Sequence, residues 1–266
     1  MRKYWLLMLA LLVFLGIASG CGSKETGGSS KKGVLDRVED AKVLKVGFEG
    51  TYPPFNFLND KKEYEGFDVD ISNEMAKRLG VKTEFVATKW ESLIGGLKSD
   101  KFDIIIGQMT VTDERKKSVD FTDPYVVTGS VLVTRKDTDN IKVLNDIKGK
   151  DVGVGGGTTF EEVAKSVDGA NVKLYKAMND YVQDLINKRL DVIINDQLLM
   201  SYNIKEKNLP IQITSDILNK DEIGMAVKKG NEDFVKKVNQ ILQEMKEDGK
   251  YNEIYKKWFG TEPLVK

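Results

Sequence analysis

Short apolar runs rich in β-branched residues alternate along this chain with segments of helical periodicity, and this order constrains the fold more than any other feature of the 266 residues. Each run has the length and composition of a buried strand. The strands that we expect are 43–48, 82–87, 102–106, 152–154, 172–175 and 191–195. Such alternation is typical of α/β folds, in which crossover helices join the strands of a mainly parallel sheet.

Two further β-rich runs indicate that the chain crosses between two such sheets. The run 126–134 is too long for one ordinary strand and is interrupted at Gly129, and the second candidate crossing is 221–227. Two crossings imply that one lobe is inserted into the other. The division that we expect is lobe 1 at 43–129 and 219–266, and lobe 2 at 130–218.

The N-terminus has the pattern of an export signal. Arg2 and Lys3 precede an apolar run at 5–17, which small residues follow, and the run is short for a membrane span. We expect residues 1–20 to be removed. Removal takes away two of the 41 basic residues and none of the 41 acidic residues, which leaves a net charge of −2.

Cys21 follows Ser19 and Gly20 as in the lipobox of bacterial lipoproteins, although Ala18 stands where leucine is commoner. We expect Cys21 to be lipidated and to anchor the protein to the outer face of the cell membrane. The alternative is a secreted chain with an incidental thiol. The next residues are rich in Gly, Ser and Lys and lack apolar periodicity, so we expect a flexible tether over 21–42.

Composition excludes several classes of function. Acidic and basic residues balance at 41 each, so no basic excess indicates a nucleic-acid partner. The chain has no histidine, which excludes His-dependent catalytic triads and His-ligated metals. With one cysteine it forms no intrachain disulfide. We therefore expect no metal, no cofactor and no nucleic acid.

The segment 107–125, after the predicted strand that ends at 106, carries the strongest motif. Thr112 is placed to cap a helical turn that begins with two acidic residues, which a helix N-terminus favours. Arg115 is the third residue of that turn and can point back toward the Thr110 hydroxyl. A guanidinium beside a hydroxyl suits a bidentate carboxylate site. From these residues alone, an ordinary solvated corner between strand and helix is an equal alternative.

The same segment resembles the binding loop of the polar amino-acid-binding proteins of ABC importers, extracellular solute-binding protein family 3. The likeness covers nearly all of 43–263, and Gln108 with the segments 46–55 and 152–162 is most similar to the cystine- and cysteine-binding members. This resemblance implies a two-lobed periplasmic-binding-protein-like fold of type II, with the ligand cleft between the lobes. It also implies a monomer that is not an enzyme, whose partners are a free amino acid, an ABC permease and its ATPase.

Aromatic residues are expected near the ends of the first two strands. Pro53 and Pro54 cannot continue a strand, so they make a rigid loop where open α/β sheets place their ligands. Tyr52 lies on this loop, and Trp90 opens a helix one β–α step later. Either ring can simply pack inward, but in the resembling family an aromatic pair encloses the ligand side chain.

The second lobe offers an anion site and an acid. Glycines at 155–157 precede a helix whose start Thr159 and Glu162 are spaced to cap, and such a loop exposes N–H groups to an anion. A flexible turn is the alternative. Asp196 ends a strand, where it caps the next helix or, as in the resembling family, meets a ligand ammonium.

Together these positions predict zwitterion capture, in which each buried ligand charge meets an opposite charge. Arg115, Thr110 and the amides of Thr158 and Thr159 would take the carboxylate, and Asp196 and Thr110 would take the ammonium. The ligand-binding residues that we expect are Glu49, Tyr52, Trp90, Gln108, Met109, Thr110, Arg115, Gly157, Thr158, Thr159 and Asp196.

Cystine suits this set because Gly155 leaves room, the two aromatic rings form a slot and Glu49 can meet a second ammonium. Arginine and glutamine are the competing ligands. Two other classes stay open: an enzyme of this fold, with Glu49 and Asp196 as its acid–base pair, and a sensor module. We expect a receptor, because sensors of this kind usually continue into a membrane helix after the binding lobes.

Overall fold

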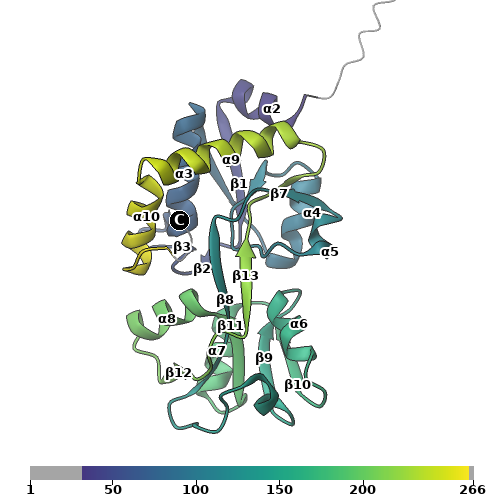
Figure 1. Cartoon of the computed structure of the whole chain (residues 1–266), viewed down its shortest axis with the longest axis vertical. Coiled ribbons are helices and arrows are strands. Elements are labelled where there is room, and N and C mark those ends of the chain that lie inside the picture. The colour runs from purple at the N-terminus through teal and green to yellow at the C-terminus, as the bar shows by residue number, and fades with distance from the viewer. Residues whose placement is uncertain (1–31, 264–266) are drawn as a thin grey trace, which may run out of the picture. The chain divides into compact units, whose positions relative to one another are not determined.

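The computed structural model describes residues 32–263, and its strands form two main sheets (Figure 1). The first sheet has the order β5-β1-β6-β14-β7. Its strands are β1 (Val43–Phe48), β5 (Lys82–Ala87), β6 (Ile104–Ile105), β7 (Val119–Phe121) and β14 (Ala226–Lys228). The pairs of β1 with β5 and β6 are parallel, and β14 is antiparallel to β6 and β7. We call this sheet and its helices lobe 1.

The second sheet has the order β10-β9-β11-β8-β12, and β13 also pairs with β8. Its strands are β8 (Val126–Arg135), β9 (Asp151–Gly155), β10 (Asn171–Tyr175), β11 (Val192–Asp196), β12 (Ile211–Ile213) and β13 (Asn219–Ile223). The strands β9, β10 and β11 are parallel, and β8 runs antiparallel to its neighbours. We call this sheet and its helices lobe 2.

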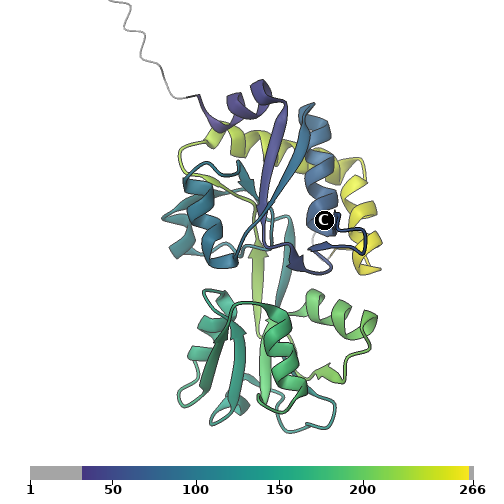
Figure 2. The ribbon, with the colours of Figure 1, turned by 180° about the vertical axis from the view of Figure 1, so that it is seen from behind.

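Two strands join the lobes. Figures 1 and 2 show β8 and β13 side by side between the two sheets, and the pairing runs from Val126 with Ile223 to Ser130 with Asn219. These strands occur where the sequence predicted the two crossings. The predicted lobe borders fall inside β8 and at the start of β13. Both strands are continuous at these borders, so the division of the chain into lobes at 130 and 218 stays a prediction. The α/β fold class is confirmed.

Helices cover both faces of the sheet in lobe 1. On one face lie α3 (Phe67–Leu79), α9 (Glu232–Glu247) and α10 (Lys250–Phe259), and on the other η1 (Trp90–Ser92) and α4 (Leu93–Lys98). The apolar residues of α9 recur at helical spacing and are buried: Phe234, Val238, Ile241, Leu242 and Met245. A small sheet of β2 (Thr51–Tyr52), β3 (Asn56–Leu58) and β4 (Tyr64–Glu65) lies between β1 and α3 in the chain.

Lobe 2 is built in the same way around its own sheet. The helix α6 (Thr159–Lys165) packs with η2 (Leu144–Ile147) on one face, and α7 (Met178–Ile186) and α8 (Gln197–Glu206) pack on the other. The short helix α5 (Asp113–Lys116) belongs to lobe 1 and precedes β7. Both sheets therefore direct strand ends and helix starts toward the region between the lobes.

The structure differs from the sequence prediction at the N-terminal side of lobe 1. A helix, α2 (Val34–Ala41), occupies the C-terminal part of the segment 21–42 that we expected to be tether. Val34 and Val38 are 1% exposed, and the Val34 amide donates to Asn231 Oδ1 at 2.8 Å. The predicted tether is therefore wrong over 34–41, because one apolar stripe fixes this helix on lobe 1. The predicted signal, Cys21 and the rest of the tether up to residue 31 lie outside the described residues.

Within residues 32–263, no helix combines the length and the apolar character needed to cross a membrane.

Candidate functional site

A pocket between the two lobes brings together most of the predicted ligand-binding residues. Lobe 1 contributes the loops after β1, β5 and β6, and lobe 2 contributes the end of β9, the start of α6 and the end of β11. All of the predicted residues line this pocket except Met109 and Gly157. The two lobes thus enclose one site, as expected for a fold that places ligands at the carboxyl ends of its strands.

Arg115 lies between the lobes. Thr112 caps α5 as predicted, since its hydroxyl accepts from the Arg115 amide at 3.2 Å. The guanidinium folds back and donates to the Thr110 carbonyl at 2.8 Å, and across the cleft to the Gly157 carbonyl at 3.3 Å. Burial lowers the pKa of Arg115, but a guanidinium stays charged in proteins. A fixed cation therefore faces the pocket with further N–H donors.

The glycine loop of lobe 2 differs in detail from the predicted anion site. The Gly156 amide donates to the Tyr175 carbonyl at 3.0 Å, and the Gly157 amide to Glu161 Oε2 at 2.7 Å, so neither is free for a ligand. Within the described part of the chain, the amides of Thr158 and Thr159 have no hydrogen-bond partner. The anion-binding capacity of the loop therefore lies in these two amides at the start of α6.

The predicted capping box at this helix is wrong. Thr158, not Thr159, is the N-cap residue, and its hydroxyl bonds to the Gly155 carbonyl at 2.7 Å instead of capping the helix. Glu161, not Glu162, reaches back to the loop amide. Glu161 is at the third helical position, but it accepts from the amide before the N-cap residue, so the loop is held by contacts other than a capping box.

Two aromatic side chains span the cleft from lobe 1. Trp90 Nε1 donates to the Gly157 carbonyl at 3.1 Å, and the Arg115 guanidinium carbon lies 5.3 Å from the Trp90 ring centroid. The Tyr52 hydroxyl donates to Asn195 Oδ1 of lobe 2 at 2.8 Å, and the Tyr52 ring stacks on Phe55 with centroids 6.0 Å apart. Both rings therefore form walls of the pocket and are held by hydrogen bonds to the opposite lobe.

Asp196 caps the helix α8, which is one of the two roles that the sequence left open, and it also lines the pocket. Its Oδ1 accepts from the Leu199 amide at 2.9 Å. Burial raises the pKa of Asp196 to about 6, although the Leu199 amide acts in the opposite direction. At neutral pH the carboxylate is mostly charged and would gain from a cationic partner.

Besides Asp196, two further acids that are buried or half-buried line the pocket. Burial raises the pKa of Glu49. A hydrogen bond from the Thr51 hydroxyl lowers this pKa, and the nearby charge of Glu91 raises it further. Asp221 on β13 is the second, and the sequence analysis treated it only as part of a crossing strand. Burial raises the pKa of Asp221, while Asn219 and Arg115 lower it. In the structure, buried Asp221 and Ile223 alternate with exposed Glu222, and this difference in burial is not visible in the sequence.

Met109 does not line the pocket as predicted, and the side chain of Gln108 is partly engaged within lobe 1. Gln108 borders the pocket, but its Nε2 donates to Asp68 Oδ1 at 2.8 Å and to the Tyr125 hydroxyl at 3.0 Å. Met109 is 2% exposed, and its side chain packs in the core with Leu93 and other apolar residues. Neighbouring residues of an extended chain point to opposite sides. Met109 therefore faces the core and Thr110 the pocket.

A buried carboxyl supports the lobe 1 side of the site. Asp68 accepts from Asn56 Nδ2 at 2.7 Å and from the Tyr125 hydroxyl and the Gln108 amide at 2.8 Å. Asn56 Oδ1 in turn accepts from the Gly50 amide at 2.9 Å, next to Glu49. Burial raises the pKa of Asp68 to about 6, opposed by these three donors. The network fixes the two loops that carry the lobe 1 residues.

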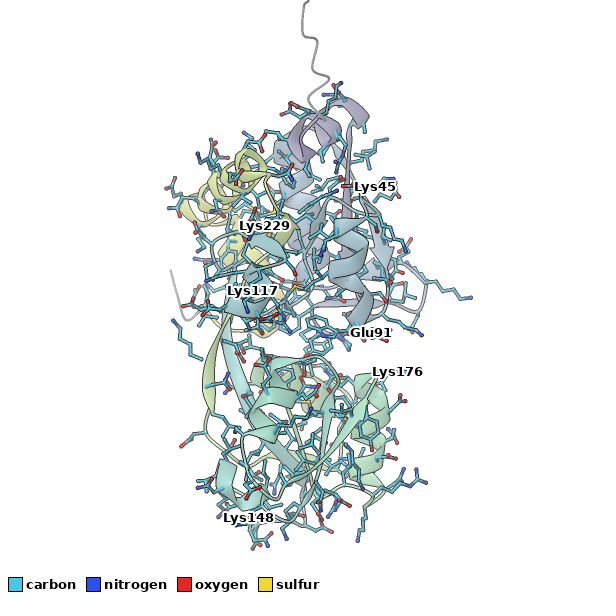
Figure 3. The ribbon with its side chains drawn as sticks, turned by 90° about the vertical axis from the view of Figure 1, so that its right-hand side faces the viewer. Lys45, Glu91, Lys117, Lys148, Lys176 and Lys229 are labelled. Atoms are coloured by element: carbon cyan, nitrogen blue, oxygen red, sulfur yellow. The ribbon has the colours of Figure 1, made fainter. Side chains whose placement is uncertain are left out.

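The outer edge of the pocket carries exposed charges that the sequence analysis also missed. Glu91 of lobe 1 and Lys176 of lobe 2 line it, and Figure 3 shows them on opposite sides of the opening. Lys176 stands at the end of β10, beside the helix α7 that brings Tyr181 into the same pocket. The pocket thus has buried charges inside and exposed charges at its rim.

Comparison with known proteins agrees with this geometry. The family model described as bacterial extracellular solute-binding proteins, family 3, matches residues 44–261. This chain belongs to that family. It is therefore an extracytoplasmic solute-binding protein and not an enzyme.

Several relatives share most of its length. The L-cystine-binding protein TcyJ of Escherichia coli K12 is 40% identical over 87% of this chain and 88% of its own. The L-cystine-binding protein TcyA of Bacillus subtilis 168 is 34% identical over 98% of both chains. A solved ancestral arginine-binding protein bound to arginine is 41% identical, with a TM-score of 0.79 over 82% of this chain and 99% of its own. The type II binding-protein fold with two lobes is thus confirmed.

Proposed function

We propose that this chain captures a free amino acid, with cystine as the best candidate, and delivers it to an ABC permease and its ATPase. The observation that carries the proposal is the charge arrangement of the pocket. Arg115, the free amides of Thr158 and Thr159 and the Asp196 carboxylate line the same pocket. An α-amino acid carries the complementary pair of charges on one carbon.

The walls of the pocket favour an amino acid with a long apolar middle. Trp90 and Tyr52 offer two ring faces from lobe 1, and Tyr181 a third from lobe 2. In cystine, a disulfide lies between two zwitterionic ends and would pass along these rings. The distal ammonium would meet Glu49, and the distal carboxylate would meet Lys176 at the rim.

The relatives support both leading ligands. TcyJ and TcyA are named for L-cystine, whereas the ancestral protein is described as bound to arginine. Arginine would satisfy Glu49 with its guanidinium, but it has no group for Lys176. Glutamine has no charge for either. We therefore place cystine first, arginine second and glutamine third.

A thermal-shift screen against the twenty amino acids and cystine tests this function. A ligand present at about 100 times its Kd stabilises the protein by about 2.7 kcal/mol, which is readily seen as a shift in Tm. We expect cystine to give the largest shift, and the ligand recovered from the complex to be unchanged. No shift with any amino acid would refute the proposed function, and a chemically altered ligand would point to an enzyme.

We also propose that Cys21 carries a lipid anchor, with the motif before it as the support. Replacing it in the full-length chain (Cys21→Ser) is expected to release the protein from the membrane fraction of the producing cells. The unaltered chain is the control. Unchanged membrane retention of the variant would contradict the anchor.

A further inference from the structure

A row of polar side chains crosses the strands that join the lobes. In the register of the sheet, Asp196 of β11 is opposite Ser130 of β8, which is opposite Asn219 of β13. Two residues further along, Thr128 is opposite Asp221. Residues paired across strands share a face, as do residues two apart in one strand. All five side chains therefore project from one face of this sheet.

This row is buried and fixes one carboxylate oxygen of Asp221. Asp221 is 4% exposed and Asp196 5%. The Asn219 amide donates to Asp221 Oδ1 at 2.9 Å, and Asn219 Oδ1 contacts the Ser130 hydroxyl. Among residues 32–263, the second oxygen of Asp221 has no hydrogen-bond partner. Because Asp221 lines the pocket, this oxygen is available to a ligand.

Thr128 is a further buried polar residue beside Asp196 and Asp221, which line the pocket. It is 3% exposed, and its Oγ1 has no hydrogen-bond partner of acceptable geometry within the described residues. Its hydroxyl is nevertheless close enough to lower the pKa of Asp196, and it shares its register position with Asp221. A buried hydroxyl without a partner destabilises a protein unless a bound group satisfies it.

We propose that Asp221 is a second carboxylate for the ligand ammonium and that it holds this group together with Asp196 and the Thr128 hydroxyl. An ammonium has three N–H donors, which matches two carboxylate oxygens and one hydroxyl. Asp221 lies on β13, one of the two strands that join the lobes. Its ion pair with the ligand would therefore link the ligand to this strand. This inference rests on the proposed function, since it names further contacts in the same pocket.

The alternative is that Asp221 only stabilises the fold, through Asn219 and the attraction of Arg115. The two roles predict opposite effects on the ligand-free protein. Asp196 and Asp221 repel each other, which is one reason that the pKa of Asp196 is raised. If Asp221 serves the ligand, removing its charge relieves this repulsion. If Asp221 only stabilises the fold, removing its charge lowers the stability of the ligand-free protein.

The test compares Asp221→Asn with Glu222→Gln, a change of the neighbouring acid on β13 that is exposed and pairs with Lys220. Cystine affinity is measured by calorimetry, and the Tm is measured without ligand. We expect Asp221→Asn to weaken binding at least tenfold with an equal or higher Tm, and Glu222→Gln to change neither. Thr128→Val is expected to weaken binding about threefold without lowering the Tm.

Two results would overturn the inference. One is unchanged cystine affinity of Asp221→Asn, and the other is a lowered Tm that accounts for its loss of binding. Failure of the proposed function is a separate result, because then the unaltered protein itself would bind no amino acid.

Discussion

The inner end of the pocket, around Arg115, Asp196 and Asp221, consists of enclosed charges held in hydrogen bonds, whereas Glu91 and Lys176 at the outer end are exposed. Buried charges without partners destabilise strongly, while exposed charges interact weakly. The inner end therefore suits the part that all amino acids share, and the outer end suits the choice among them. Each prediction below tests one part of this contrast.

The largest losses are expected at the inner end. Arg115→Lys keeps the charge but loses the planar guanidinium, and Asp196→Asn keeps the shape but loses the charge. Breaking a buried ion pair costs about 2–5 kcal/mol, so each change should weaken binding of every amino acid ligand by at least tenfold. Calorimetry measures this, with Lys116→Arg and Asp180→Asn as exposed controls. Unaltered affinity would remove that residue from the site.

Lowering the pH should weaken binding and stabilise the free protein. The pKa of Asp196 is raised to about 6, so below pH 6 this carboxyl takes up a proton and loses its attraction for an ammonium. Affinity should then fall by up to about tenfold per pH unit. Because the raised pKa lets the folded state bind more protons, the contribution of Asp196 to folding stability grows as pH falls through the same range.

Calorimetry and thermal melts between pH 7 and pH 5 check both effects. Asp68 has a raised pKa as well and adds to the change in stability, but not to the loss of binding, because it does not line the pocket. Asp196→Asn should reduce the pH dependence of affinity and leave the part that Glu49 and Asp221 contribute, since the pKa values of these two pocket acids are raised as well. Constant affinity of the unaltered protein over this range would contradict the role of Asp196.

The aromatic walls should give an intermediate effect. Trp90→Ala removes a ring face and the hydrogen bond to the Gly157 carbonyl, whereas Tyr52→Phe removes only the hydroxyl bonded to Asn195. We expect the first to weaken cystine binding by at least tenfold and the second by a few-fold, because one net hydrogen bond contributes about 1 kcal/mol. Trp90→Phe is the control that keeps a ring. A larger loss from Tyr52→Phe would contradict this order.

The smallest effect is expected at the outer end, and it should change selectivity. Lys176→Gln removes the cation proposed for the distal carboxylate of cystine. We expect cystine to bind a few-fold more weakly and arginine equally or slightly more tightly, since an exposed pair contributes less than about 1 kcal/mol. Lys173→Gln, whose lysine pairs with Asp151 outside the pocket, is the control. Equal losses for both ligands would assign Lys176 a role other than selectivity.

The sequence predicted the fold class and the main strands because its apolar runs are short and regularly spaced. It failed at α2, where Val34 and Val38 form a narrow stripe among charged residues. The sequence also predicted that Gly155 is a glycine in order to leave room for a large ligand. In the structure, a Cβ at this position would lie 3.1 Å from the Thr158 side chain. Packing inside the loop therefore restricts this position as well.

The parts of the site that could be predicted are those whose geometry depends on residues close together in the sequence. Thr112 and Arg115 are close in sequence, so a capped turn already directs the guanidinium toward Thr110. Asp221 and Thr128 were missed because they meet through the register between β8 and β13, although they are 93 positions apart in the sequence. No local pattern specifies such a pairing.

The most direct test of the account is a calorimetric titration of the unaltered protein with cystine, arginine and glutamine under the same conditions. The charges at both ends of the pocket predict one-to-one binding, with cystine at the lowest Kd and glutamine at the highest. Arginine or glutamine bound tenfold more tightly than cystine would contradict the assignment of the outer end, and no binding of any of the three would contradict the account of the inner end.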